Sequence, residues 1–201
     1  MSLNRTLRAS LAAASLVLGP FVAAQAEGIS YTFVELGYLT TDLDGIGKDL
    51  DGFVLRGSFE VADDWFLYAR YLDQSVSVAG VDFDAQQYAV GGGYAWSFAD
   101  NMDLYGRIGY TEVELDTSGG GFGGVGVDDD GYELGVGIRA RPIDPLELEG
   151  AINYVDLSDA GDDTSFGVAA RWFITDMFAL GLEGEFADDA DTYGIGFRLQ
   201  F

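Results

Sequence analysis

The sequence predicts an all-β protein: a closed antiparallel up-and-down transmembrane β-barrel of ten strands. Apolar side chains alternate with period two in ten successive segments. Aromatic side chains recur at two levels along the apolar face of these segments. The 201 residues include 29 glycines and only 3 prolines, which favours strands and tight turns over linkers. Eight strands is the alternative, if the hairpin over residues 164–187 is misassigned.

The composition excludes several classes of function. The chain has no histidine and no cysteine, so Ser-His-Asp hydrolysis, thiolate zinc sites and disulfides are impossible. A net charge of −24 opposes nucleic-acid binding, because phosphates would meet a surface of the same sign. Intrinsic disorder does not fit a chain that is 48% hydrophobic and 14% aromatic. We therefore expect a folded protein without a nucleic-acid partner.

Residues 1–26 have the pattern of a secretory signal peptide. Arg5 and Arg8 precede an apolar run over 11–18, and Ala24-Gln25-Ala26 supplies the small residues of a cleavage site. An N-terminal membrane anchor is the alternative. We predict that 1–26 is removed and that 27–201 forms the barrel. Such a chain is expected in the cell outer membrane of a Gram-negative bacterium.

The expected strands are separated by connections of two kinds. The strands are expected over 29–40, 51–61, 65–75, 84–97, 102–114, 131–141, 146–157, 164–174, 178–187 and 191–201. Odd-numbered connections are longer and acidic, whereas even-numbered ones are short. Short periplasmic turns alternating with longer outer loops are typical of an up-and-down membrane barrel. An even number of strands places both termini on the periplasmic side.

Two aromatic belts are expected on the lipid-facing side. One ring lies near the loop end of every strand: Tyr38, Phe53, Tyr71, Tyr88, Tyr110, Tyr132, Tyr154, Phe166, Phe186 and Tyr193. Others lie near the turn end: Phe59, Trp65, Trp96, Trp172, Phe178 and Phe201. At about 3.3 Å per residue and a tilt of about 40°, the eight steps from Tyr193 to Phe201 cover roughly 20 Å of the bilayer normal. This separation is close to the apolar band of an outer-membrane barrel.

The opposite face of the strands carries charges that are expected to line the lumen as ion pairs. The residues assigned to these pairs are Glu35, Arg56, Arg139, Glu147, Glu149, Arg171 and Arg198. Hairpin registers are expected to place Glu35 opposite Arg56, Arg139 opposite Glu147, and Glu149 opposite Arg171. The last pairing assumes that Tyr154 aligns with Phe166. Pairing offsets the cost of removing these charges from water.

The lumen has two interpretations. The first is a packed ionic plug, which is favoured because barrels of about eight strands are filled by side chains. The second is a narrow hydrated path for small solutes, for which inward glycines such as Gly91 and Gly135 would provide volume. Carboxylate pairs such as Glu147/Glu149 resemble glycosidase acids, but opposing arginines account for them. No catalytic residue, cofactor or metal ligand is assigned.

The expected outer loops hold most of the aspartates. The stretch over 42–51 departs from the spacing of an EF-hand, so no defined calcium site is predicted. The clusters are expected to form a solvated surface. Loose bridging by divalent cations to lipopolysaccharide phosphates is the alternative. Outer-membrane lipid and lipopolysaccharide are the expected partners.

The last strand and several shorter stretches carry a family resemblance. Tyr193, Phe197, Leu199 and Phe201 form a C-terminal pattern that resembles the signal read by the barrel assembly machinery. Together with the stretches 31–38, 41–45 and 81–84, it makes the chain similar to the small outer-membrane β-barrel superfamily. Within it, the chain resembles the xanthomonad outer-membrane proteins once proposed as activators of rice immunity. The resemblance implies an integral envelope protein and no catalytic residues.

Three functions are compatible with these observations. The first is a non-enzymatic barrel with a structural, surface or adhesion role and acidic outer loops. The second is a narrow channel for small solutes across the outer membrane. The third is a soluble, secreted, lipocalin-like binding protein, which the aromatic belts disfavour.

Overall fold

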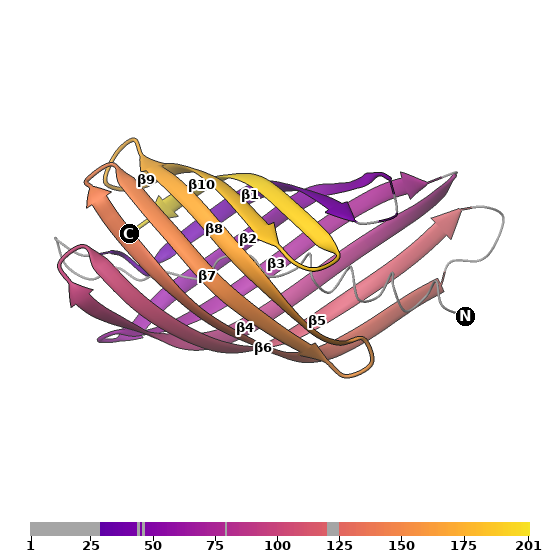
Figure 1. Cartoon of the computed structure of the whole chain (residues 1–201), viewed down its shortest axis with the longest axis horizontal. Coiled ribbons are helices and arrows are strands. Elements are labelled where there is room, and N and C mark those ends of the chain that lie inside the picture. The colour runs from indigo at the N-terminus through magenta and orange to yellow at the C-terminus, as the bar shows by residue number, and fades with distance from the viewer. Residues whose placement is uncertain (1–28, 44, 46, 79, 120–124) are drawn as a thin grey trace.

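The computed structural model describes residues 29–43, 45, 47–78, 80–119 and 125–201 (Figure 1). The predicted signal peptide lies outside these residues. The strands are β1 (Phe33–Leu43), β2 (Asp49–Ala62), β3 (Trp65–Val78), β4 (Val81–Ala99), β5 (Met102–Gly119), β6 (Val125–Ile143), β7 (Leu146–Leu157), β8 (Gly161–Phe173), β9 (Phe178–Phe186) and β10 (Ala190–Gln200). The described residues contain no helix that is long and apolar enough to cross a membrane.

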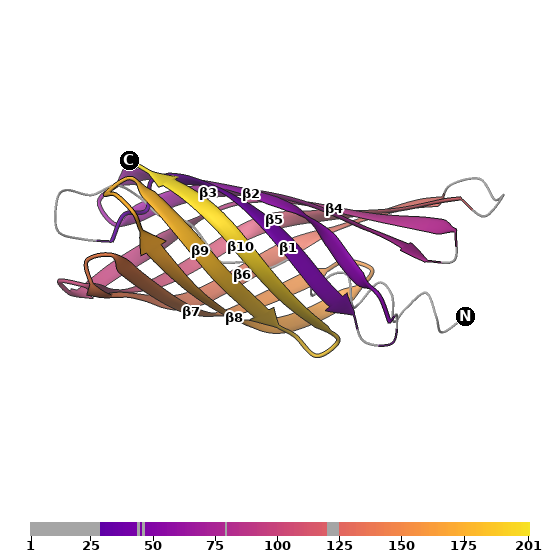
Figure 2. The same cartoon turned by 90° about the horizontal axis from the view of Figure 1, so that it is seen from above.

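The ten strands form one closed barrel. Each strand pairs antiparallel with its neighbours in sequence, and β1 pairs with β10 (Figures 1 and 2). Closure leaves no strand edge with unpaired backbone groups. The prediction of ten strands is confirmed, since residues 161–173 and 178–186 form the separate strands β8 and β9.

The two ends of the barrel differ. The turn end carries the connections β2–β3, β4–β5, β6–β7 and β8–β9, together with the start of β1 and the end of β10. The hairpin end carries the connections β1–β2, β3–β4, β5–β6, β7–β8 and β9–β10. Hairpins β3–β4 and β5–β6 project furthest at this end, on the right of Figures 1 and 2.

The connections at the hairpin end are shorter than predicted. The sequence predicts loops over 76–83 and 115–130, but β4 begins at Val81, β5 continues to Gly119 and β6 begins at Val125. Polar residues such as Asp84 and Asp116 pair directly across β4 and β5. Alternation continues through these acidic stretches, because backbone hydrogen bonds form between antiparallel strands whatever their side chains.

The two faces of the wall separate apolar from ionic side chains as predicted. On β6, Tyr132, Leu134 and Val136 point outward, with 49% of Val136 exposed. Arg139 on the same strand points inward and is 0% exposed. A period of two places alternate residues on opposite faces. The apolar exterior and the ionic interior therefore follow directly from the sequence.

The first strand begins later than predicted. The sequence predicts a strand from residue 29, whereas β1 starts at Phe33. Ile29 and Tyr31 are buried, and the Tyr31 ring stacks on Phe66 with centroids 5.2 Å apart. The Phe201 backbone N–H donates to the Thr32 carbonyl oxygen at 3.0 Å. These contacts hold residues 29–32 at the turn end, where Ile29 and Tyr31 belong to the same buried cluster as Phe66.

Two predicted registers are wrong. Arg139 lies opposite Glu149, not Glu147, because the register shifts between Ala140 and Ile143. The tight turn after that irregularity pairs Ile143 with Leu146.

The second error concerns β7 and β8. Phe166 lies opposite Ile152, so Arg171 lies opposite Glu147 rather than Glu149. The connection between the strands is shorter than the sequence suggests, since β8 begins at Gly161. A shift of two residues retains the faces and changes the partners.

Candidate functional site

The lumen contains an ionic network centred on Glu35 and Glu147. Glu35 is directly opposite both Arg56 on β2 and Arg198 on β10. Arg56 Nη1 pairs with Glu35 Oε1, and Arg198 Nη2 lies 2.6 Å from Glu35 Oε2. Arg171 Nε donates to the same Oε2 at 3.3 Å. The predicted Glu35/Arg56 pair is therefore present, within a larger cluster.

Glu147 is shared by several guanidinium groups. Arg139 Nη2 donates to Glu147 Oε1 at 2.5 Å, and Arg171 Nη1 and Arg198 Nη1 lie 3.2 and 3.4 Å from the same oxygen. Arg171 Nη1 also donates to Glu149 Oε2 at 2.7 Å. The Arg139/Glu147 and Glu149/Arg171 ion pairs thus form diagonally, although neither pair is directly opposite across the strands. All these residues are buried.

A second network is centred on Glu133 of β6. Arg70 Nη2 donates to Glu133 Oε2 at 3.0 Å, and Tyr68 Oη donates to Oε1 at 2.6 Å. Arg107 Nη1 lies 3.6 Å from Oε1. Tyr68 and Arg70 belong to β3, which is not a neighbour of β6 in the barrel. The network therefore crosses the lumen.

Aromatic rings occupy the space that the inward glycines provide. A Cβ on Gly109 would lie 2.2 Å from the Tyr68 hydroxyl, and a Cβ on Gly93 would lie 2.2 Å from Phe66 Cζ. Tyr105 similarly lies against Gly137 and donates to Glu149 Oε1 at 2.6 Å. These glycines therefore accommodate rings instead of forming an open path.

The two lumen tyrosines were not singled out from the sequence. Tyr68 shares its strand face with Arg70, and Tyr105 shares its face with Arg107. Residues of the same parity as an inward arginine point into the lumen. That rule identifies both tyrosines and the buried amide Gln74, which shares β3 with Arg70. Strand β4 has no arginine, and there Gln87 is identified by its position opposite the apolar face that carries Tyr88 and Val90.

An apolar layer covers the network at the hairpin end. Leu43, Leu50 and Ala190 form a buried cluster against which Val76 and Leu115 pack. Thr41, Thr192 and Gln74 lie directly below it, with the two threonine hydroxyls 2.9 Å apart. A water-filled pore would leave its lining accessible, whereas Thr41 and Leu39 are fully buried.

The predicted aromatic belt lies on the outside of the wall. Its ten residues are exposed or half-buried: Tyr38, Phe53, Tyr71, Tyr88, Tyr110, Tyr132, Tyr154, Phe166, Phe186 and Tyr193. Tyr71 pairs directly with Tyr88, and Tyr110 pairs directly with Tyr132. The Tyr71 and Tyr88 ring centroids are 5.0 Å apart. Such rings on an apolar surface are typical of a membrane interface.

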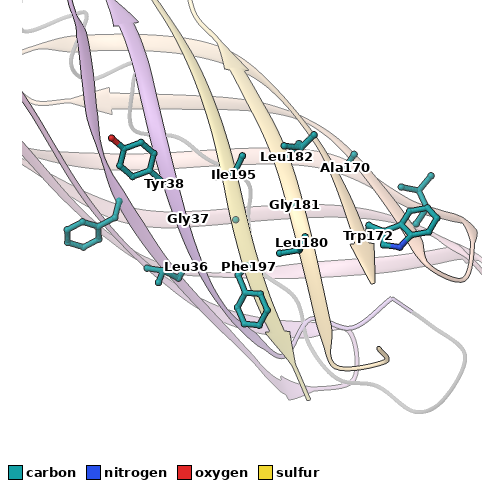
Figure 3. Close-up of a pocket in the computed structure, with 13 residues that line it drawn as sticks. Leu36, Gly37, Tyr38, Ala170, Trp172, Leu180, Gly181, Leu182, Ile195 and Phe197 are labelled. Atoms are coloured by element: carbon teal, nitrogen blue, oxygen red, sulfur yellow. The ribbon is translucent and has the colours of Figure 1, made fainter. Parts of the chain in front are cut away.

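A shallow groove of about 880 Å³ lies on the outer face of strands β1, β8, β9 and β10. Leu36, Leu180, Leu182, Ile195 and Phe197 project from these strands around it (Figure 3). Ala170 contributes the small side chain between larger neighbours. The groove is part of the apolar band, so lipid chains are its natural surroundings.

The predicted assembly residues occupy β10 and the residue after it. Tyr193 and Phe197 point outward, Leu199 is half-buried, and 58% of Phe201 is exposed. The Phe178 and Phe197 rings stack with centroids 5.5 Å apart. The structure shows these positions, while their recognition during assembly stays a prediction.

The hairpin end is strongly acidic. Residues 40–51, 74–84, 113–130, 156–164 and 187–192 contain 18 acidic residues and one basic residue, Lys48. Burial and the neighbouring carboxylates of Asp188 and Asp189 raise the pKa of Asp163. No group of three or more acidic side chains in the described part of the chain is arranged to hold a metal ion.

Several solved structures are similar to this chain in fold. The NanC porin matches with a TM-score of 0.55 and 7% identity, over 84% of this chain and 100% of that chain. The translocator domain of autotransporter NalP from Neisseria meningitidis matches with a TM-score of 0.50 and 8% identity, over 99% and 95%. Ail, the attachment invasion locus protein of Yersinia pestis, matches with a TM-score of 0.48 and 17% identity, over 84% and 95%.

The sequence comparisons give the family. No curated protein sequence matches the chain. A family model described as an outer membrane protein beta-barrel domain matches residues 9–201. This match covers nearly the whole chain, and the closed ten-stranded barrel with its apolar exterior agrees with it. The chain belongs to the outer membrane protein beta-barrel domain family and is a protein of the cell outer membrane.

Proposed function

We propose that the protein is a closed, non-enzymatic barrel that displays an acidic surface outside the cell, with a structural or adhesive role. The observation that supports this most directly is the filled lumen. Glu133, Glu147, Arg139, Thr41 and Leu39 point into the lumen and are each 0% exposed. None of these five side chains presents a surface that a solute could contact.

The hairpin end supports the adhesive part of the proposal. Asp128, Asp162 and Asp188 lie on three different hairpins and are all exposed. Lys48 is the only basic side chain nearby in sequence, and its Nζ donates to the Ser77 carbonyl oxygen at 2.5 Å. Such a surface attracts a cationic partner and repels anionic ones. The resemblance to the xanthomonad group favours the same kind of surface role.

Adhesion of whole cells tests the proposal. Cells displaying the wild-type chain are expected to adhere to an amine-coated surface more than cells that carry Asp128→Asn, Asp162→Asn and Asp188→Asn together. The matched control is Asp63→Asn, Asp64→Asn and Asp100→Asn, which removes the same charge at the turn end. Equal adhesion by the wild type and the hairpin variant would contradict the adhesive role.

Planar-bilayer recordings test the closed lumen separately. The refolded wild-type protein is expected to show no stable open level above leak. A reproducible open level would instead support the alternative, a narrow channel for small solutes.

A further inference from the structure

A cavity of about 510 Å³ lies at the turn end, between the β6–β7 turn, the β8–β9 turn and the end of β10. It is lined by polar and charged groups from Ser30, Arg141, Asp144, Asp176 and Gln200. The Gln200 amide donates to the Asp176 carbonyl oxygen at 2.9 Å, which ties β10 to the β8–β9 turn. The cavity is therefore a built part of the barrel mouth, and none of the lumen pairs described above occupies it.

Arg141 is the cation of this cavity. Its guanidinium carbon lies 4.2 Å from the centroid of the Phe173 ring, and its Nε lies 3.5 Å from Glu147 Oε2. The Arg141 backbone is held by the β4–β5 turn, where its N–H donates to the Asn101 carbonyl oxygen at 2.9 Å. The side chain is 21% exposed, so a fixed guanidinium presents one edge to the cavity.

Arg141 makes the longest of the Glu147 contacts in the ion-pair network. Ion pairs connect five arginines to four glutamates: Arg56, Arg139, Arg141, Arg171 and Arg198 with Glu35, Glu147, Glu149 and Glu183. Glu147 already faces three closer guanidinium groups, and Arg141 is the most distant of its partners. An anion at the exposed edge of Arg141 would give this guanidinium a charge-assisted partner that it does not share with three other arginines.

The rest of the rim has the opposite sign. The four connections at the turn end contribute Asp63, Asp64, Asp100, Asp144 and Asp176, and no lysine or arginine. Asp144 and Asp176 line the cavity itself and are exposed. A purely anionic ligand would be repelled by these carboxylates, whereas a ligand with an ammonium group beside its anion satisfies both charges.

The apolar surroundings indicate a lipid. Ile174 and Phe201, which also line the cavity, are 61% and 58% exposed. Pro145 and Phe173 of the cavity are followed or preceded in sequence by Leu146 and Trp172, which line the outer groove of Figure 3. The cavity and the groove thus adjoin the same turn-end stretch of β7 and β8, and a lipid would occupy both by crossing the rim of the wall there.

We propose that the turn-end cavity binds the headgroup of a zwitterionic phospholipid of the inner leaflet. Its phosphate pairs with Arg141, its ammonium group pairs with Asp144 and Asp176, and one acyl chain lies in the outer groove. Short turns face the periplasm in this family of barrels, so the cavity lies at the level of the inner-leaflet headgroups.

Lipid retention by the refolded full-length mature chain tests the proposal. The protein in detergent micelles is mixed with phosphatidylethanolamine, phosphatidylglycerol or phosphatidylcholine of identical chains, and retained lipid is counted by native mass spectrometry. Phosphatidylethanolamine is expected to be retained about tenfold more than phosphatidylglycerol, as for one charge-assisted contact. Phosphatidylcholine is expected to be retained less than phosphatidylethanolamine, because its quaternary ammonium has no N–H donor.

Substitutions of the cavity residues test whether lipid retention depends on the cavity. Arg141→Gln is expected to lower the retention of phosphatidylethanolamine about tenfold, because it removes the partner of the phosphate, whereas Lys48→Gln removes the same charge at the hairpin end and should leave retention unchanged. Asp144→Asn with Asp176→Asn is expected to raise retention of phosphatidylglycerol toward that of phosphatidylethanolamine. Heat-modifiable gel mobility verifies that each variant is folded.

Equal retention of phosphatidylethanolamine and phosphatidylglycerol by the wild type would overturn the proposal. So would unchanged retention of phosphatidylethanolamine in folded Arg141→Gln, or an equal fall in Lys48→Gln. If Arg141→Gln does not fold, the wild-type preference and the double aspartate variant decide the outcome.

Discussion

Tyr68 on β3 and Glu133 on β6 are joined across the lumen by a hydrogen bond of 2.6 Å, although their strands are not neighbours. Arg70 adds a second link to Glu133 from the same strand. The interior is thus braced across its width as well as along its wall. We therefore expect the buried charges of the lumen to contribute to the free energy of unfolding in addition to the hydrogen bonds between the strands.

Glu133→Gln is expected to destabilise the barrel by about 3–5 kcal/mol, because it leaves Arg70 and Arg107 buried without their anion. Reversible urea unfolding in lipid vesicles measures the change. Asp100→Asn, at an exposed turn position, is the control and should shift the free energy of unfolding by no more than about 0.5 kcal/mol. Similar losses in both variants would show that the network does not stabilise the fold.

Val136→Arg is expected to cost about 2–4 kcal/mol, because it places a charge on the lipid-facing side near the middle of the apolar band. Ser118→Arg introduces the same side chain at an exposed position of the β5–β6 hairpin. It should be close to neutral. The same unfolding assay compares the two, and equal tolerance would contradict the assignment of the lipid-facing surface.

Deletion of Phe201 is expected to lower the amount of assembled barrel in cells while changing refolding in micelles only slightly. The side chain is 58% exposed, so its loss removes little buried surface. Heat-modifiable mobility measures both quantities. Phe98→Ala, which alters another exposed ring at the turn end, is the control. An equal fall in cells for both variants would argue against a specific assembly signal.

Asp163→Asn is expected to stabilise the protein at pH 8 by about 0.5 kcal/mol, since solvent screens much of this half-exposed cluster. Burial and nearby aspartates raise the pKa of Asp163, so its charged form is disfavoured in the folded state. That destabilisation is present above the folded pKa and is relieved as the pH falls through it. Unfolding measured between pH 8 and pH 4 should therefore show a smaller difference at the acidic end.

Asp128→Asn removes an exposed acid from a neighbouring hairpin and serves as the control for this pH series. A gain in Asp163→Asn that does not shrink toward low pH would contradict the titration of Asp163 as its cause.

Side-chain parity predicted the faces of the wall, since Val136 and Arg139 differ by an odd number of residues and point to opposite sides. It did not predict the partners. The irregularity between Ala140 and Ile143 and the short turn before Gly161 each moved the pairing by two residues. Such shifts retain the faces, so the hydrophobic pattern contains no signal for them.

The period-two alternation also failed to predict that residues 29–32 precede the first strand. Tyr31 continues the alternation of β1 in sequence, yet its ring stacks on Phe66 across the mouth. The diagonal ion pairs could not be predicted from the pattern either, because long arginine side chains reach carboxylates two residues away from the position directly opposite. Arg171 contacts Glu35, Glu147 and Glu149 together, and period-two reasoning counts only one partner opposite each residue.

The direct pairing of Glu35 with Arg198 joins the first strand to the last. Before β1 pairs with β10, Arg198 is separated from Glu35 and Glu147, its partners in the closed barrel. A half-finished cylinder would therefore hold unmatched charges in hydrocarbon, so insertion and circularisation should occur as one cooperative event. The unpaired charges thereby destabilise the open sheet relative to the closed barrel, and they shorten the time during which its free strand edges could aggregate.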